Sequence, residues 1–220
     1  MHVVATAGHV DHGKSTLVEA LTGTDPDRFA EEKARGLTID LGFAATTLPS
    51  GAALSLVDVP GHVRFLKNML AGVGAVDACL FVVAATEGWK PQSEEHLRIL
   101  QLLGIGHGVI ALTKVGTADE DLVDLARLEI IEQVEGTFLD GAAVVATDAP
   151  TGVGLDDLRA ALDDLVAHGH HDLSGYKLPG AIRIVDRLPL NSGDKLDRRA
   201  LAAHEARSQA TSQISNQTGD

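Results

Sequence analysis

A short apolar run at the N-terminus leads directly into a glycine-rich loop, and this junction constrains the fold more than any other feature of the sequence. The run is VVATA at residues 3–7, and GHVDHGKST follows at residues 8–16. The loop fits the phosphate-binding template GxxxxGKS/T at every fixed position. Its glycines let backbone N–H groups face an anion at the positive end of the helix that follows. The junction therefore predicts a strand–loop–helix unit that binds nucleotide phosphates.

Apolar, strand-like runs alternate with helical stretches from residue 1 to about residue 167. This order predicts an α/β fold of the P-loop NTPase type, with a mostly parallel sheet and helices on both faces. The PSG turn at residues 49–51 is so short that the strands beside it should be antiparallel at the sheet edge. The expected strands are 2–7, 41–48, 53–58, 78–84, 108–113 and 142–147, and the expected helices are 14–23, 62–73, 91–103, 118–135 and 155–167.

The alternation of strands and helices is expected to stop after the domain at residues 1–167. Residues 168–174 are polar and predict a flexible linker, although their three histidines leave a metal site open as an alternative. Residues 175–206 predict a short strand–turn–helix tail. The Ser/Gln/Asn/Thr-rich residues 207–220 predict a disordered end.

The composition narrows the class of partner. The chain carries 31 Asp and Glu against 18 Lys and Arg, a net charge of −13, which argues against nonspecific binding of nucleic acid through a broad basic face. Cys79 is the only cysteine, and its apolar neighbours predict a buried thiol. No apolar run is as long as a membrane span, and the N-terminus lacks the pattern of a signal peptide. We therefore expect a cytoplasmic monomer without membrane contacts.

Two further motifs bring Mg²⁺ ligands to the phosphate loop. DVPGH at residues 58–62 ends a predicted strand, where an aspartate can hold Mg²⁺ and a glycine can offer its N–H to a terminal phosphate. GLTI at residues 36–39 carries the Thr38 hydroxyl, which is placed to reach the same ion. In this chemistry Lys14 reaches the terminal phosphates and the Ser15 hydroxyl ligates Mg²⁺.

These motifs together resemble the GTPase domain of translational elongation factors. The segments that carry the resemblance are GHVDHGKST, RGLTIDLGF, DVPGH and EGWKPQSEEH, at residues 8–16, 35–43, 58–62 and 87–96. Within that group, TGTDPDR at residues 22–28 and IDLG at residues 39–42 most resemble the selenocysteine-specific elongation factor. The resemblance covers about residues 1–167. It implies binding of GTP or GDP with Mg²⁺, and GTP hydrolysis that is slow unless the ribosome stimulates it.

The resemblance also implies a role for individual residues. His62 would orient the attacking water, and the apolar pair Val10 and Leu37 would gate access to it. The catalytic residues would be His62, Lys14 and Thr38, and the Mg²⁺ ligands would be Ser15, Thr38 and Asp58, the last through a bound water. The nucleotide would be held by Gly8, His9, Val10, Asp11, His12, Gly13, Lys14, Ser15, Thr16, Asp58, Gly61, Thr113, Lys114, Asp148 and Ala149, with the loop at Asp148 and Ala149 offering a backbone N–H to the guanine oxygen.

The guanine-reading motif departs from the family pattern. TKVG at residues 113–116 stands where the pattern is Asn/Thr-Lys-x-Asp, so Gly116 replaces an aspartate that accepts hydrogen bonds from the guanine ring N–H and amino group. Losing hydrogen bonds to a charged group weakens binding by about ten- to a hundredfold or more. We therefore expect reduced guanine affinity and selectivity, and tighter guanine binding after Gly116→Asp. Asp119 and Asp121 are either substitutes for the carboxylate or acids at a helix start.

The tail resembles a different group of proteins. Residues 175–203 are similar to the C-terminal end of adenylate-forming enzymes, especially nonribosomal peptide synthetase adenylation domains, and carry LPLNSGDKLDRR at residues 188–199. Lys195 matches a lysine that contacts the acyl-adenylate in that family. The large adenylating core is not recognised in the sequence, so we expect no adenylation activity and regard the chain as a hybrid.

Partners follow from the resemblance to the whole elongation factor. It implies the ribosome and selenocysteyl-tRNA, although no tRNA-binding β-barrels and no module that reads mRNA are recognised after residue 167. Two other function classes stay open beside the GTPase. One is a noncatalytic or truncated nucleotide-binding module with weakened guanine selectivity, and the other is a module associated with a carrier or ligase, which rests on the tail alone.

Overall fold

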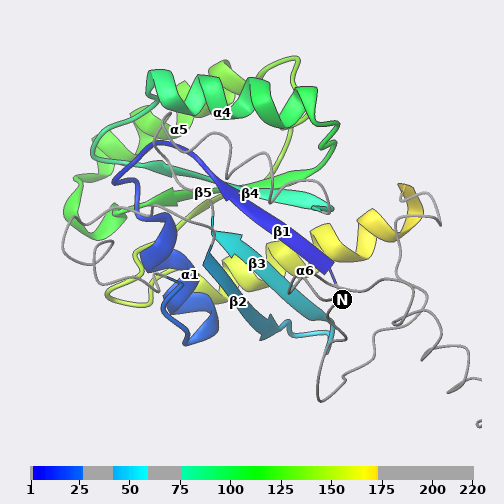
Figure 1. The fold of residues 1–220 in the computed structure, drawn as a ribbon. Helices are drawn as coiled ribbons and strands as arrows, with labels where there is room; N and C mark the ends of the chain where they lie inside the picture. Colours follow the sequence, from blue (N-terminus) through cyan, green and yellow to red (C-terminus); the bar gives the residue numbers. More distant parts are fainter. Residues whose placement is uncertain (1, 27–41, 59–75, 173–220) are drawn as a thin grey trace, which may run out of the picture. The chain divides into compact units, whose positions relative to one another are not determined.

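The strands assemble into a sheet with the order β2-β3-β1-β4-β5-β6 (Figure 1). The computed structural model describes residues 2–26, 42–58 and 76–172. All neighbouring strands are parallel except β2 and β3, which pair antiparallel at the edge. The strands are β1 (His2–Ala7), β2 (Gly42–Thr47), β3 (Ala53–Asp58), β4 (Ala78–Ala84), β5 (Gly108–Thr113) and β6 (Val144–Ala146).

Helices cover both faces of this sheet. Figure 1 shows α4 (Pro91–Leu102) and α5 (Glu120–Val134) over one face, and α1 (Lys14–Thr22) and α6 (Leu155–Asp172) over the other. A short 3₁₀ turn, η2 (Val115–Thr117), joins β5 to α5. Among the described helices, none combines the length and the apolar character that crossing a bilayer requires.

Two apolar cores result, one on each face of the sheet. One is packed by the buried faces of α4 and α5 and the other by those of α1 and α6. Strand β4 contributes side chains to both cores. All seven of its residues are buried, as expected of a strand covered on both sides. Phe81 on β4 stacks on Trp89 with 5.4 Å between ring centroids. Cys79 is a free thiol in this strand, as predicted, and burial raises its pKa.

The predicted elements agree closely with the observed ones in the described residues. The predictions for β1, β3, β4 and β5 match residue for residue, and the antiparallel edge pair is confirmed. Strand β6 is shorter than the predicted 142–147, because Thr147 and Asp148 enter a loop that bridges back to Val153. The predicted helix at 62–73 and the predicted tail at 175–206 lie outside the described residues.

The linker predicted at residues 168–174 is wrong for its first five residues. Helix α6 continues to Asp172 and does not end at residue 167. The polar composition that suggested a linker does not oppose a helix, and the one glycine in this stretch, Gly169, lowers helix propensity by about 1 kcal/mol without ending a long helix. The remaining domain boundaries stay predictions.

Two leucines of α4 provide a matched test of this packing. Leu100 is 0% exposed and Leu102 is 88% exposed. We expect Leu100→Ala to lower the free energy of unfolding by about 2–5 kcal/mol, because it leaves a cavity in the core. Leu102→Ala should change it by less than about 0.5 kcal/mol. Urea unfolding followed by circular dichroism measures both, and similar losses for the two variants would contradict the assigned orientation of α4.

Candidate functional site

The phosphate loop turns sharply between β1 and α1 with the help of backbone conformations that favour glycine. Gly8 has a φ of 127° and Gly13, which caps the N-terminus of α1, has a φ of 84°. A Cβ on Gly8 would lie 2.1 Å from the carbonyl oxygen of Val82 on β4, so no other residue fits there. No side chain caps the start of α1. The first N–H groups of α1 are therefore suited to bind an anion at the positive end of the helix.

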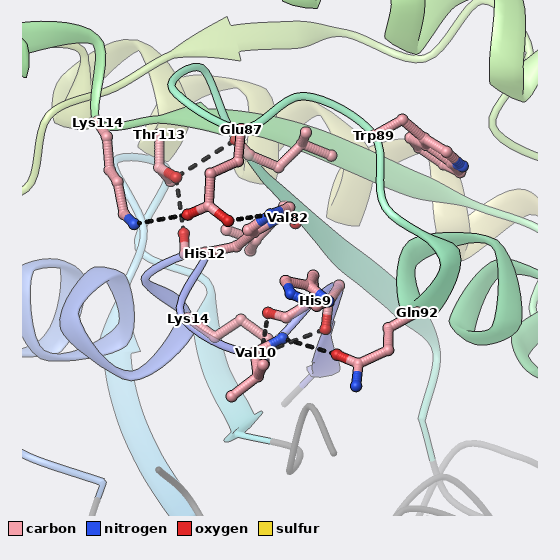
Figure 2. A network of polar contacts seen from close by, with 12 residues as sticks. His9, Val10, His12, Lys14, Val82, Glu87, Trp89, Gln92, Thr113 and Lys114 are labelled. Carbon is pink, nitrogen blue, oxygen red and sulfur yellow. Dashed lines mark hydrogen bonds and ion pairs between the residues drawn. The ribbon is translucent and has the colours of Figure 1, made fainter. Parts of the chain in front are cut away.

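Helix α4 holds the phosphate loop from the side. The Gly8 N–H donates to His96 Nδ1 at 3.0 Å, and the Val10 N–H donates to Gln92 Oε1 at 3.2 Å. The latter contact is drawn in Figure 2. His96 is buried and Gln92 half-buried. Both belong to the segment at residues 87–96, whose sequence indicates the family resemblance but does not indicate that these two side chains support the loop.

Lys14 lies folded over the phosphate loop. Its side chain is 6% exposed, and its ammonium donates to the carbonyl oxygens of Gly8 at 3.2 Å and His9 at 2.7 Å (Figure 2). Burial lowers the pKa of Lys14 from 10.5 to about 8, against the opposing attraction of Asp58 and Asp11. A phosphate at the start of α1 would give this ammonium an anionic partner and favour its charged form.

Ser15 and Asp58, which the sequence predicts as Mg²⁺ ligands, are hydrogen bonded to each other beside the loop. The Ser15 hydroxyl donates to Asp58 Oδ2 at 2.6 Å, and the Thr6 hydroxyl donates to Oδ1 at 2.7 Å. Asp58 is fully buried. A hydroxyl and a carboxylate are hard oxygen donors of the kind that Mg²⁺ prefers, so these residues fit the ion. The Thr6 contact was not predicted, although its place on β1 in front of the loop was visible in the sequence.

Thr113 uses its hydroxyl within the protein. Thr113 Oγ1 donates to the His12 carbonyl at 2.7 Å and to the Val83 carbonyl at 3.3 Å, and the side chain is buried. The end of β5 is thus tied to the phosphate loop (Figure 2). Its contacts join the end of β5 to the phosphate loop and to β4, and its predicted role in holding the nucleotide stays a prediction.

Lys114 begins the turn after β5 and pairs with Glu87. It adopts a left-handed conformation with a φ of 59°, and its ammonium lies 3.2 Å from Glu87 Oε1. Glu87 Oε2 lies 4.0 Å from His12 Nε2 (Figure 2). His9, His12 and Glu87 place their ligand-type atoms within 4.8 Å of one another. Because Glu87 already has Lys114 as its cationic partner, we assign this group to the support of the loop.

The loop after β6 lies next to the turn after β5. The Val115 N–H donates to the Thr147 carbonyl at 3.4 Å, and the Thr147 N–H donates to the Leu112 carbonyl at 2.7 Å. Asp148 is buried and Ala149 half-buried. Asp119 caps the N-terminus of α5, where its carboxylate accepts from the Leu122 N–H at 2.8 Å. This confirms the helix-start interpretation of Asp119.

The structure brings most of the predicted site residues to one edge of the sheet. These residues lie at or just after the carboxyl ends of strands: the phosphate loop, Asp58, the Thr113–Lys114 turn and the Asp148–Ala149 loop. Within the loop, Asp11 and Thr16 are exposed. The predicted residues that lie outside the described ones are Leu37, Thr38, Gly61 and His62.

Comparisons with known proteins identify relatives with a GTP-binding domain, which agrees with the phosphate-loop geometry described above. The family model described as "Elongation factor Tu GTP binding domain" matches residues 1–168. A selenocysteine-specific elongation factor from Desulfomicrobium baculatum is 48% identical and is aligned over 92% of this chain and 36% of that protein. The selenocysteine-specific elongation factor of Escherichia coli (strain K12) is 46% identical over 80% of this chain and 29% of its own.

Solved structures give the same result. The crystal structure of a bacterial selenocysteine-specific elongation factor, EF-Sec, has a TM-score of 0.73 and 44% identity over 76% of this chain and 29% of its own. Elongation factor SelB from Methanococcus maripaludis, in complex with the GTP analogue GppNHp, has a TM-score of 0.65 and 27% identity over 85% of this chain and 36% of its own. The chain thus spans about a third of the length of these relatives.

The similarity extends past the limit predicted at residue 167. Residues 1–168 are 168 of 220, so an alignment over 92% of the chain cannot be confined to them. The alignment with the Desulfomicrobium baculatum factor therefore includes part of the tail, and the hybrid origin of the chain stays a prediction. The resemblance of residues 175–203 to adenylate-forming enzymes is not supported by these relatives.

His12 allows a test of the buried loop by pH. It is 0% exposed, and burial lowers its pKa from 6.5 to about 4. Between these values the unfolded chain binds the proton and the folded chain does not, so the free energy of unfolding falls as the pH drops from 6.5 to 4. His12→Asn lacks this loss and keeps a donor for the Val82 carbonyl, which lies 3.3 Å from His12 Nδ1.

The measurement is urea unfolding of wild type and His12→Asn at pH 7 and pH 5. We expect the difference between wild-type and variant stability to fall by about 1–2 kcal/mol at the lower pH. An unchanged difference would show that His12 titrates alike in the folded and unfolded chains.

Proposed function

Because the chain belongs to the family of the elongation factor Tu GTP binding domain, we propose that it binds GTP and GDP with Mg²⁺ and hydrolyses GTP slowly on its own. The observation that carries this proposal is the arrangement at the start of α1. There the unblocked helix N-terminus, the buried Lys14 ammonium and the Ser15–Asp58 pair adjoin one another. Together they offer backbone donors and a cation for a nucleoside triphosphate, and hard oxygen ligands for its Mg²⁺.

Different residues of the chain would bind the phosphates and the Mg²⁺. The α1 N–H groups and Lys14 bind phosphate oxygens, with the Lys14 ammonium moving from the Gly8 and His9 carbonyls to the ligand. Ser15 directly and Asp58 through a bound water would hold Mg²⁺, which when bound would neutralise charge on the terminal phosphates. Thr38 as a further Mg²⁺ ligand, Gly61 as a phosphate donor and His62 as the residue that orients water are proposed from the family resemblance.

Partners are proposed from the relatives, whose names specify selenocysteine. We place the chain in selenocysteine incorporation, with the ribosome and selenocysteyl-tRNA as partners of the whole factor, and in the cytoplasm. The ribosome would orient His62 and accelerate hydrolysis. A noncatalytic remnant is not favoured, because Lys14, Ser15 and Asp58 all take positions that suit a phosphate and its Mg²⁺.

Lys14→Ala tests the phosphate site. We expect it to raise the Kd for GDP and for a nonhydrolysable GTP analogue by about a hundredfold, because hydrogen bonds from a buried cation to phosphate are lost. Arg98→Ala is the matched control for charge, since Arg98 is exposed on α4 and paired with Glu94. Calorimetric titration in Mg²⁺ measures both, and an ATP analogue that binds as tightly as the GTP analogue would refute a guanine-nucleotide site.

Ser15→Ala tests the Mg²⁺ site. In wild type, we expect removal of Mg²⁺ by EDTA to weaken binding of the GTP analogue by about tenfold or more. Ser15→Ala should bind the analogue alike with and without Mg²⁺, because a ligand of the ion is gone. Ser50→Ala, in the β2–β3 turn, is the control and should keep the full response to Mg²⁺. A full response in Ser15→Ala as well would contradict the assigned ligand.

A further inference from the structure

Gly116 stands where a guanine-reading carboxylate was expected, and the space beside it is already filled. A Cβ built on Gly116 would lie 2.7 Å from Asp148 Oδ2, 2.8 Å from Asp148 Cγ and 3.2 Å from Oδ1. The first two distances are shorter than real Cβ atoms show, so a side chain at 116 and the Asp148 carboxylate in this position compete for the same space. The glycine and the aspartate therefore belong together as one arrangement.

The residues around Asp148 hold its backbone and one carboxylate oxygen in place, but none of the described ones gives the carboxylate a positively charged partner. Asp148 is 4% exposed, and its N–H donates to the Val153 carbonyl at 2.9 Å, which anchors the backbone. The Thr151 hydroxyl donates to Oδ2 at 2.6 Å, whereas no donor reaches Oδ1 within the part of the chain that the structure describes. Nor does any described Lys, Arg or His pair with this carboxylate. A carboxylate so buried favours a ligand that supplies N–H donors.

Asp148 also lies on the edge of the sheet along which a nucleotide would extend. The end of β5 is tied to the phosphate loop by the Thr113–His12 contact, and the loop after β6 is tied to the turn after β5 by the Val115–Thr147 contact. A nucleotide with its phosphates at the start of α1 therefore directs its base past Lys114 toward this second loop. This step rests on the proposed function.

We propose that the Asp148 carboxylate reads the guanine base in place of a side chain at position 116. Its two oxygens accept hydrogen bonds from the guanine ring N–H and the exocyclic amino group. Adenine presents a ring-nitrogen lone pair at the first of these positions and no amino group at the second, so the carboxylate repels it. On this account guanine selectivity is kept, and it comes from the loop after β6 and not from the turn after β5.

The proposal reverses the result expected for Gly116→Asp. The new carboxylate would be pressed against that of Asp148, and two like charges in contact with little water between them repel each other. Gly116→Asp alone should therefore fail to tighten GDP binding. Gly116→Asp combined with Asp148→Ser should recover affinity that Asp148→Ser alone loses, because one carboxylate again faces the base.

The decisive experiment compares GDP with xanthosine diphosphate, whose base carries a carbonyl in place of the amino group. Asp148→Asn offers one acceptor to the ring N–H and one donor to that carbonyl. We expect it to weaken GDP by about ten- to a hundredfold and to tighten xanthosine diphosphate. Asp156→Asn is the control, since the Asp156 side chain is fully exposed on α6, and it should change neither Kd.

Calorimetric titration of each variant in Mg²⁺ separates this inference from the proposed function. A changed preference between the two bases in Asp148→Asn, with rescue by the double variant, supports the inference. Equal losses for both nucleotides, or no loss, would overturn it, as would tighter GDP binding by Gly116→Asp alone. Failure of the proposed function shows separately, as an unchanged Kd in Lys14→Ala.

Discussion

The close approach of Gly8 to the Val82 carbonyl is the constraint on which the rest of the site depends. It fixes where β1 stops beside β4 and the direction in which the chain leaves the sheet. The same residue donates its N–H to His96 on α4, so strand, loop and helix are held at one point. Because the loop is positioned by contacts with β4 and with His96 and Gln92 of α4, the N–H groups at the start of α1 keep their direction.

The buried charges of the site are held by hydrogen bonds to neutral groups and, for Lys14, also by the attraction of the Asp58 and Asp11 carboxylates. Lys14 is held by two carbonyl oxygens, and Asp58 accepts from two hydroxyls. Each contact offsets part of the cost of burying a charge without neutralising it. A phosphate beside Lys14 and a divalent cation beside Asp58 would each bring a charge of the opposite sign, which links the electrostatics of the loop to its affinity for a nucleotide.

The sequence predicted the fold well where a pattern is local. The apolar run of β4 and the strand–loop–helix junction were placed correctly, because hydrophobic periodicity and glycine spacing act over a few residues. The end of α6 was misplaced, since polar residues fit a linker and a solvated helix equally well. His96, Gln92 and Thr6 were not identified as supports of the site, because their partners lie on other elements.

What the sequence by itself determined is the phosphate end of the site: the glycines, Lys14 and Ser15 lie within one short loop, and their spacing is enough to specify the geometry. What only the tertiary structure decided is the base end. From the sequence alone, Gly116 indicates that an expected carboxylate is absent, and Asp148 is only an acidic residue in a loop. Packing of β6 beside β5 brings the two into contact, because the pairing of parallel strands joins residues that no local pattern relates.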